Sequence, residues 1–201
     1  MRPVRMITGT AVALDRSDVD TDQIIPSEWL KRIERTGFGA GLFAEWRDDP
    51  AFVLNQPEHG GATILVAGEN FGTGSSREHA VWALVDYGME AVVSSRFGEI
   101  FRHNATRSGL VPVEVEPGLA RALMDAVKAD PGLELTIDVE RRTLEAPAAG
   151  IEGTFRLDDD ARNRLLKGLD DIDVTLGHLA EIDEFEARRP AWLMPVTDSG
   201  S

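Results

Sequence analysis

The chain contains no cysteine in its 201 residues. Disulfides, thiol nucleophiles and cysteine-ligated clusters built by this chain alone are therefore excluded. Its four histidines, His59, His79, His103 and His178, show neither the HExxH pattern nor another metal-ligand spacing. We therefore expect no metal site that this chain completes by itself.

The chain also lacks a basic excess and a long hydrophobic run. Lys and Arg number 21 against 35 Asp and Glu, for a net charge of −14, which argues against binding nucleic-acid phosphates. No run approaches the roughly 20 apolar residues of a membrane-spanning helix, and residues 1–5 lead into no signal-peptide core. We expect no nucleic-acid or membrane partner and a cytoplasmic location.

The order of apolar segments predicts an α/β fold. Strands are expected at residues 6–14, 62–67, 90–95, 110–115 and 133–139, with a further β-layer from 143–145 and 154–157. Helices are expected at residues 27–35, in part of 42–55, at 80–85, at 97–108, from residue 117 onwards and at 158–169, with a last helix that ends before Pro190. Gly88 and Gly109 are expected to stop the helices that precede them, and aspartates at 158–160 to cap the helix that they begin. No repeat or linker divides the chain. We expect one compact domain at 1–194 and a disordered tail at 195–201.

Residues 68–80 form a glycine-rich loop between an expected strand and an expected helix. Such a loop lets backbone N–H groups approach a ligand, and a helix N-terminus favours an anion. Three nucleophile or nucleotide motifs fail there. A dinucleotide fingerprint needs glycine where Arg77 stands, a phosphate-binding loop needs a lysine, and a hydrolase elbow needs a second glycine that Gly74-Ser75-Ser76-Arg77-Glu78 lacks.

Two serines and an arginine remain at the expected helix start. Backbone dipoles could stabilise the alkoxide of Ser75, which would then act as a base towards a substrate C–H proton. Ser76 and Arg77 could hold a substrate carboxylate, since the guanidinium offers bidentate geometry. The alternative is structural: Ser75 and Ser76 cap the helix and Arg77 pairs with Glu78 or a neighbour.

Two earlier segments carry further candidate residues. Asp18, Asp20 and Asp22 alternate as at the start of an EF-hand, but the sixth and twelfth positions are Gln23 and Trp29. An Asx-rich turn and a carboxylate facing a shared active site both remain open.

The basic residues Lys31, Arg32 and Arg35 precede a glycine-rich segment at 36–41 with the composition of a mobile loop. This arrangement suits capture of a carboxylate under a flap, or is simply a solvated helix face.

The motif strings together resemble one family. They are N-F-G-x-G-S-S-R-E-H-A at 70–80, D-T-D-Q-I-I-P at 20–26, T-G-F-G at 36–39, A-L-x-D-Y-G at 83–88, F-G-E-I-F at 97–101 and L-V-P-V at 110–113. The pattern is similar to the swivelling domain of the aconitase superfamily, and in particular to small subunits of bacterial 3-isopropylmalate dehydratases. It extends through residues 190–192, with Thr73 standing where some relatives have cysteine. The resemblance implies a single β/β/α layered domain with a barrel-like sheet.

The resemblance also implies a chemistry. A large-subunit partner in a heterodimer would carry a 4Fe–4S cluster on its own cysteines, and 2-isopropylmalate would be isomerised to 3-isopropylmalate through isopropylmaleate in leucine biosynthesis. Ser75 would be the general base. The substrate, a small dicarboxylate, would be bound by Ser76, Arg77, Asp22 and Arg32.

Two alternatives remain beside this hypothesis. The chain could be the small subunit of a related hydro-lyase acting on homoaconitate, citraconate or 2,3-dimethylmalate. Residues 28–41 would then discriminate, and Phe38 and Leu42 could face an isopropyl group. It could also be a non-catalytic binding module of the same fold, although a scaffold has no chemical need for Ser75, Ser76 and Arg77 together.

Overall fold

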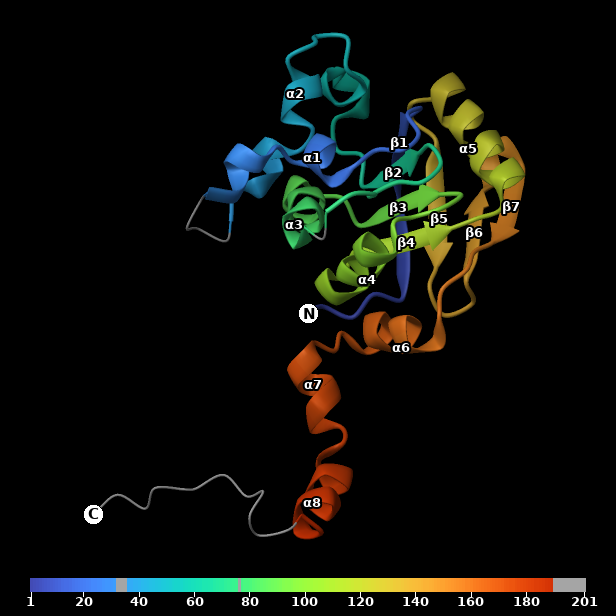
Figure 1. The fold of residues 1–201 in the computed structure, drawn as a ribbon. Helices are drawn as coiled ribbons and strands as arrows, with labels where there is room; N and C mark the ends of the chain where they lie inside the picture. The colour runs from blue at the N-terminus through green and yellow to red at the C-terminus, as the bar shows by residue number, and fades with distance from the viewer. Residues whose placement is uncertain (32–35, 76, 190–201) are drawn as a thin grey trace.

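A single mixed sheet organises the computed structural model, which describes residues 1–31, 36–75 and 77–189, with only the backbone at 30 and 31. Its strands are β1 (Met6–Leu14), β2 (Ile64–Ala67), β3 (Ala91–Ser94), β4 (Val111–Glu114), β5 (Glu134–Asp138), β6 (Thr143–Ala146) and β7 (Ile151–Thr154). They lie in the order β4-β3-β2-β1-β5-β6-β7 (Figure 1). The predicted α/β class is confirmed, as are the first five strands to within two residues at each end.

The first four strands form a parallel half. β1 pairs with β2, β2 with β3, and β3 with β4, all parallel, with Ala11 beside Ile64 and Ile64 beside Ala91. All four residues of β2 and of β3 are buried. Strands covered by helices on both faces read as continuous apolar runs, which is why residues 62–67 and 90–95 were recognisable.

The remaining strands form an antiparallel half that continues from β1. β5, β6 and β7 pair successively, and the sheet curls around on this side (Figure 1). Burial alternates along β5, as expected for strands with one face towards the core. The last strand was predicted three residues too late, at 154–157. The turn at Pro147–Ala149 and Gly150, which has φ +64°, places the return strand earlier.

Helices cover both faces of the parallel half. α3 (Glu78–Tyr87) and α4 (Glu99–Ser108) share one core with Val12, Leu65 and Val92. α5 (Pro117–Ala129) packs on the opposite face with Ala11 and Val66. α3 and α4 end at Gly88 and Gly109, as predicted, and the structure shows both glycines in the left-handed conformation.

Short helical turns fill the excursion between β1 and β2. They are α1 (Thr21–Ile24), α2 (Ala44–Arg47) and the 3₁₀ turns at Ser27–Lys31, Phe38–Gly41, Val53–Asn55 and Pro57–His59. The helix predicted at 27–35 is therefore a 3₁₀ turn as far as residue 31, and its remainder lies outside the described residues.

Three helices close the described chain. α6 (Asp159–Lys167) begins after Asp158, whose carboxylate caps it as predicted. One last helix was expected before Pro190, but two are present, α7 (Asp171–Leu176) and α8 (Leu179–Ala187), separated at Gly177 and His178. They project away from the sheet (Figure 1). Residues 190–201, which include the predicted tail, lie outside the described residues.

Candidate active site

Three loops meet at the carboxyl edge of the parallel strands. They follow β1, β2 and β3, and they pair with one another through single parallel bridges, Asp20 with Thr73 and Phe71 with Phe97. Parallel strands bring their carboxyl ends to one edge of a sheet, which is where ligands bind in open α/β folds. The middle loop, residues 68–77, is the one singled out by its sequence.

The loop after β1 holds one side of the middle loop. Gly72 N donates to Val19 O at 2.7 Å, and Thr21 N donates to Thr73 O at 2.9 Å. The buried Thr21 also donates its hydroxyl to Ser75 O at 3.0 Å. The backbone of Ser75 is thus fixed by a side chain that lies 54 residues earlier in the sequence.

The loop after β3 holds the other side. Phe71 N donates to Arg96 O at 3.0 Å, and Gly98 N donates to Phe71 O at 2.9 Å. A Cβ on Gly98 would lie 2.2 Å from Gly72 O, and one on Gly72, which has φ +76°, would lie 2.3 Å from the Phe101 ring. Both glycines therefore permit a close approach that any side chain would block.

Ser75 is presented at the end of this loop, just before α3. Its side chain is exposed, and among the described residues no hydrogen bond to its hydroxyl is found. Its carbonyl accepts from Arg77 N at 2.8 Å, and the N-cap of α3 is Arg77, which gives no side-chain capping bond. Ser75 therefore does not cap the helix, while Ser76 lies outside the described residues.

Arg77 and Asp22 come together as an ion pair across the two loops. The Arg77 side chain is 21% exposed and that of Asp22 54% exposed. The alternative in which Arg77 pairs with a neighbour is thus correct in part, but the neighbour is a second candidate site residue rather than Glu78. The pair fixes the guanidinium at the base of the loop and leaves part of it accessible.

The other two aspartates of the first loop have structural roles. Asp18 Oδ1 accepts from Asn70 Nδ2 at 2.7 Å and so joins the two loops again. Asp20 caps α1 by accepting from Gln23 N at 2.8 Å, and Asp20 N donates to Gln23 Oε1 at 3.0 Å. The turn interpretation therefore holds for Asp18 and Asp20, and Asp22 alone faces the candidate site.

The segment after the basic cluster is packed against α3. Phe38 and Leu42 are fully buried, with the Phe38 ring edge-on to His79, so the prediction that these two side chains face a substrate is wrong. Gly39 N donates to Asp86 Oδ2 at 2.8 Å, and a Cβ on Gly39 would lie 2.7 Å from the Tyr87 nitrogen. Gly39 therefore allows the segment to pack closely against α3. Arg32 lies outside the described residues.

Sequence reasoning missed Thr21. Its hydroxyl was visible inside the D-T-D string, but nothing local indicates that it faces Ser75, because the contact depends on the pairing of two distant loops.

Among residues 1–31, 36–75 and 77–189, no three His, Asp or Glu side chains gather in a way that could hold a metal ion. None of the helices described there is long and apolar enough to cross a membrane.

Comparisons with known proteins identify the family. Residues 1–118, more than half of the chain, match the model of the aconitase C-terminal domain, and residues 171–193 match that of the C-terminal domain of 3-isopropylmalate dehydratase small subunits. The chain is 63% identical over 190 residues to the 3-isopropylmalate dehydratase small subunit of Parafrankia sp. (strain EAN1pec), covering 94% of this chain and 96% of that one. It is 56% identical over 196 residues to that of Rubrobacter xylanophilus, covering 98% and 100%.

A solved structure supports the same assignment. The crystal structure of 3-isopropylmalate dehydratase from Methanocaldococcus jannaschii matches with a TM-score of 0.64 at 25% identity, covering 92% of this chain and 99% of that one. The predicted resemblance and the predicted layered fold are thus confirmed. The chain belongs to the family of 3-isopropylmalate dehydratase small subunits, hydro-lyase subunits built on the aconitase C-terminal domain fold.

Proposed function

We propose that this chain supplies the proton-transfer and carboxylate-binding half of the active site that converts 2-isopropylmalate to 3-isopropylmalate through isopropylmaleate. The observation that carries the proposal is the exposed Ser75, two residues before the partly exposed Arg77, at the start of α3. Both sit on a loop fixed from two sides by backbone hydrogen bonds. Such a loop can hold reacting groups in one geometry, which proton transfer requires.

Ser75 is the proposed base. A serine hydroxyl gives up its proton only if the alkoxide is stabilised, and the free N–H groups of a helix start supply fixed positive dipoles. α3 offers such a start because its N-cap residue, Arg77, makes no side-chain capping bond. Ser75 would remove a proton from the CH2 carbon adjacent to the one that bears the hydroxyl, as the hydroxyl leaves. During hydration the hydroxyl adds to that CH2-derived carbon, and Ser75 would return a proton to the carbon that first bore the hydroxyl.

Arg77 is the proposed ligand of a substrate carboxylate. A guanidinium has five N–H donors, so Arg77 can bind a carboxylate while it keeps its ion pair with Asp22. Asp22 would orient Arg77 and could accept a hydrogen bond from the substrate hydroxyl. Ser76 and Arg32 stay predictions as further carboxylate ligands.

The reaction also needs a group that helps the hydroxyl to leave. We assign this to a 4Fe–4S cluster on a large subunit, because this chain has no cysteine to ligate one. When bound, such a cluster supplies a Lewis acid for the leaving hydroxyl. The exposure of Ser75 is what a site completed by a second chain requires. Heterodimer formation and the cytoplasmic location remain part of this proposal.

Reconstitution tests the proposal. The chain and its large subunit are mixed anaerobically with iron and sulfide, and isopropylmaleate formation is followed by its ultraviolet absorbance. We expect activity only from the mixture, and a loss of at least a hundredfold in kcat for Ser75→Ala, in line with removal of a general base. Ser17→Ala, an exposed serine in the loop after β1, is the matched control. Undiminished activity of Ser75→Ala would contradict the assignment.

A further inference from the structure

The C-terminal helices α7 and α8, with their flanking residues, form an arm at residues 170–189 that extends beyond the rest of the fold (Figure 1). No residue from 170 to 189 is buried. Among the described residues, the side-chain contacts of α8 and its ends stay within the helix: His178 with Glu181, Arg188 with Glu184 and Arg189 with Phe185. Among the described residues, no hydrogen bond or ion pair joins α8 to the sheet or its covering helices.

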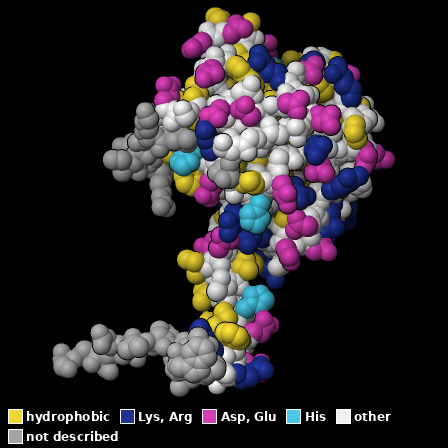
Figure 2. All heavy atoms as spheres, viewed as in Figure 1, with side chains coloured by type: hydrophobic (Ala, Val, Ile, Leu, Met, Phe, Trp, Pro, Cys, Tyr) yellow, Lys and Arg dark blue, Asp and Glu magenta, His cyan; other side chains and the backbone are white. Residues whose placement is uncertain are grey.

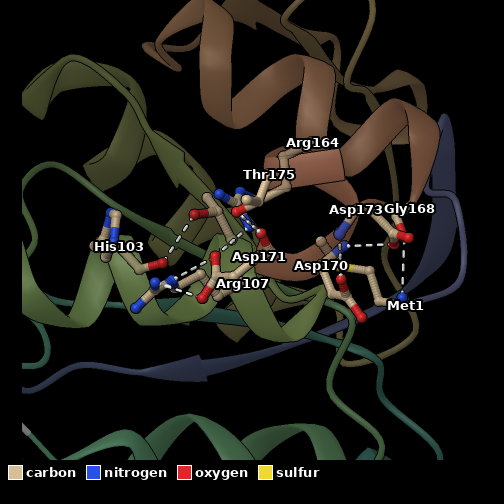
Figure 3. Close-up of polar contacts among 10 residues, drawn as sticks. Met1, His103, Arg107, Arg164, Gly168, Asp170, Asp171, Asp173 and Thr175 are labelled. Carbon is tan, nitrogen blue, oxygen red and sulfur yellow. Dashed lines mark hydrogen bonds and ion pairs between the residues drawn. The ribbon is translucent and has the colours of Figure 1, made fainter. Parts of the chain in front are cut away.

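Within the described part of the chain, the polar side-chain contacts between the arm and the rest of the fold lie at the base of the arm. Asp171 lies between Arg107 of α4 and Arg164 of α6, at 2.5 Å from Arg107 Nη2 and 2.7 Å from Arg164 Nη1 (Figure 3). Just before the arm, the amino group of Met1 donates to Gly168 O at 2.9 Å. The direction of the arm is therefore set by the body, while α8 receives no support from it.

The arm exposes large apolar side chains. Ile172 is 69% exposed, Leu176 52%, Leu179 49% and Phe185 64%. Figure 2 shows hydrophobic side chains in yellow along the projecting arm. Helices of six and nine residues are marginal in water unless an apolar face is packed. Exposed apolar side chains gathered on a projecting element mark an interaction surface. A second surface must therefore cover the arm in the assembled protein.

The charge of the arm indicates what kind of surface this is. Residues 170–189 contain seven carboxylates against two arginines, within a chain whose net charge is −14. A second copy would bring the same excess of negative charge to the contact, which disfavours pairing of two arms. An apolar groove bordered by Lys and Arg would complement the arm in both respects.

We propose that the arm docks into such a groove on the large subunit, and so holds the two subunits together away from the reacting atoms. The family model that matches residues 171–193 describes the C-terminal domain of small subunits and is separate from the aconitase C-terminal domain match at 1–118. The arm thus belongs to the part of the chain that matches small subunits in particular. This inference rests on the proposed function, since it takes the large subunit as the partner.

The test measures subunit affinity without substrate. Full-length chain carrying Leu176→Ser and Leu179→Ser is titrated with the large subunit, and the Kd is compared with that of wild type. We expect the Kd of the double variant to be at least tenfold higher than that of wild type, and to increase further as salt is added. The kcat at saturating large subunit should stay within twofold of wild type. Met6→Ser is the matched control, because Met6 is 59% exposed and begins β1, at the edge of the sheet opposite the Ser75 loop. Its Kd should stay within twofold.

Three outcomes would overturn the inference. An unchanged Kd in the double variant would show that the arm does not dock there. If the isolated double variant sediments differently from the isolated wild-type chain, the arm contacts a second copy. If the isolated double variant has a lower Tm than the isolated wild-type chain, the arm packs on its own body. If the wild-type pair binds through the arm yet forms no isopropylmaleate, the proposed function fails while the docking stands.

Discussion

Two parts of the molecule stand apart from the sheet and its covering helices: the loop at residues 68–77 and the arm at residues 170–189. The loop is short and is bound on both sides by backbone hydrogen bonds from the segments that follow β1 and β3. The arm is long and is bound at its base by the side chains around Asp171. Both carry exposed groups that the core does not use, the hydroxyl of Ser75 in one case and apolar side chains in the other.

The difference follows from what each part is proposed to do. Proton transfer needs atoms held to a fraction of an ångström, so backbone hydrogen bonds and close glycine contacts are appropriate around Ser75. Docking needs accessible apolar area, and its final geometry comes from the partner. Substitutions in the loop should therefore change the rate of the reaction, and substitutions in the arm should change assembly.

The largest effect is expected from Gly98→Ala. Its Cβ would lie 2.2 Å from the backbone oxygen of Gly72, so the two loops would have to separate. We expect kcat to fall by at least a hundredfold and Tm to fall by several degrees, measured by steady-state assay of the reconstituted enzyme and by thermal unfolding. Gly118→Ala is the control, because nothing lies within 4 Å of a Cβ there. Equal effects of the two substitutions would contradict the role of loop contact.

Arg77→Lys should have the next largest effect. Lysine keeps the charge and its attraction to Asp22, but it loses the bidentate geometry for a carboxylate. We expect kcat/KM to fall about thirtyfold, in line with the roughly 2 kcal/mol of a charge-assisted hydrogen bond, mainly through KM. Steady-state kinetics on the reconstituted enzyme checks this, with Arg121→Lys of α5, far along the chain and exposed, as control. If the two variants have the same kcat/KM, Arg77 does not bind the substrate.

Thr21→Val should act on Ser75 through its backbone. The substitution keeps the shape of a buried side chain and removes the hydrogen bond to Ser75 O. We expect kcat to fall about tenfold with KM nearly unchanged, and stability to fall by about 1 kcal/mol, the usual net value of one such bond. Thr21→Ser should restore kcat because it keeps the hydroxyl. A positioning role for Thr21 fails if the serine and valine variants have the same kcat.

Local signals made much of this molecule predictable. Gly88 and Gly109 end α3 and α4 as expected, since a left-handed helix end depends on the glycine itself. The β2 and β3 runs were clear because both of their faces are buried. A short string of residues also predicted that Ser75 and Arg77 lie at the start of a helix, which is where α3 begins. The break between α7 and α8 was also signalled, by Gly177, but the helical spacing of the apolar residues on either side obscured it.

Features that depend on distant pairing were not predictable. The contact of Thr21 with Ser75 and the ion pair of Asp22 with Arg77 exist because the loops after β1 and β2 lie side by side. The burial of Phe38 likewise depends on α3, which supplies His79 and Trp82 around its ring. A glycine-rich composition does not distinguish a flexible segment from one that packs closely against a helix.

The smallest effect is expected at the base of the arm. Partial burial opposes ionisation of Asp171, but hydrogen bonds from Arg164 and Arg107 outweigh it, so the pKa of Asp171 lies below its usual value of 3.8. A carboxylate with a lowered pKa in the folded state contributes stability that is present above its unfolded pKa. That contribution is lost as the pH falls below about 3.8 and through the lower folded pKa.

Hydrogen exchange of the α7 backbone measures this fastening. We expect Asp171→Asn to reduce α7 protection about threefold at pH 7 and to leave α3 unchanged, because side chains as exposed as these interact weakly through solvent. Asp183→Asn, on α8, is the control and should leave α7 protection unchanged. Since the fastening only directs the arm, kcat at saturating large subunit should not change in either variant. Loss of α3 protection in Asp171→Asn would mean that the arm and the Ser75 loop are coupled, and the contrast between a fixed loop and a separately held arm would not hold.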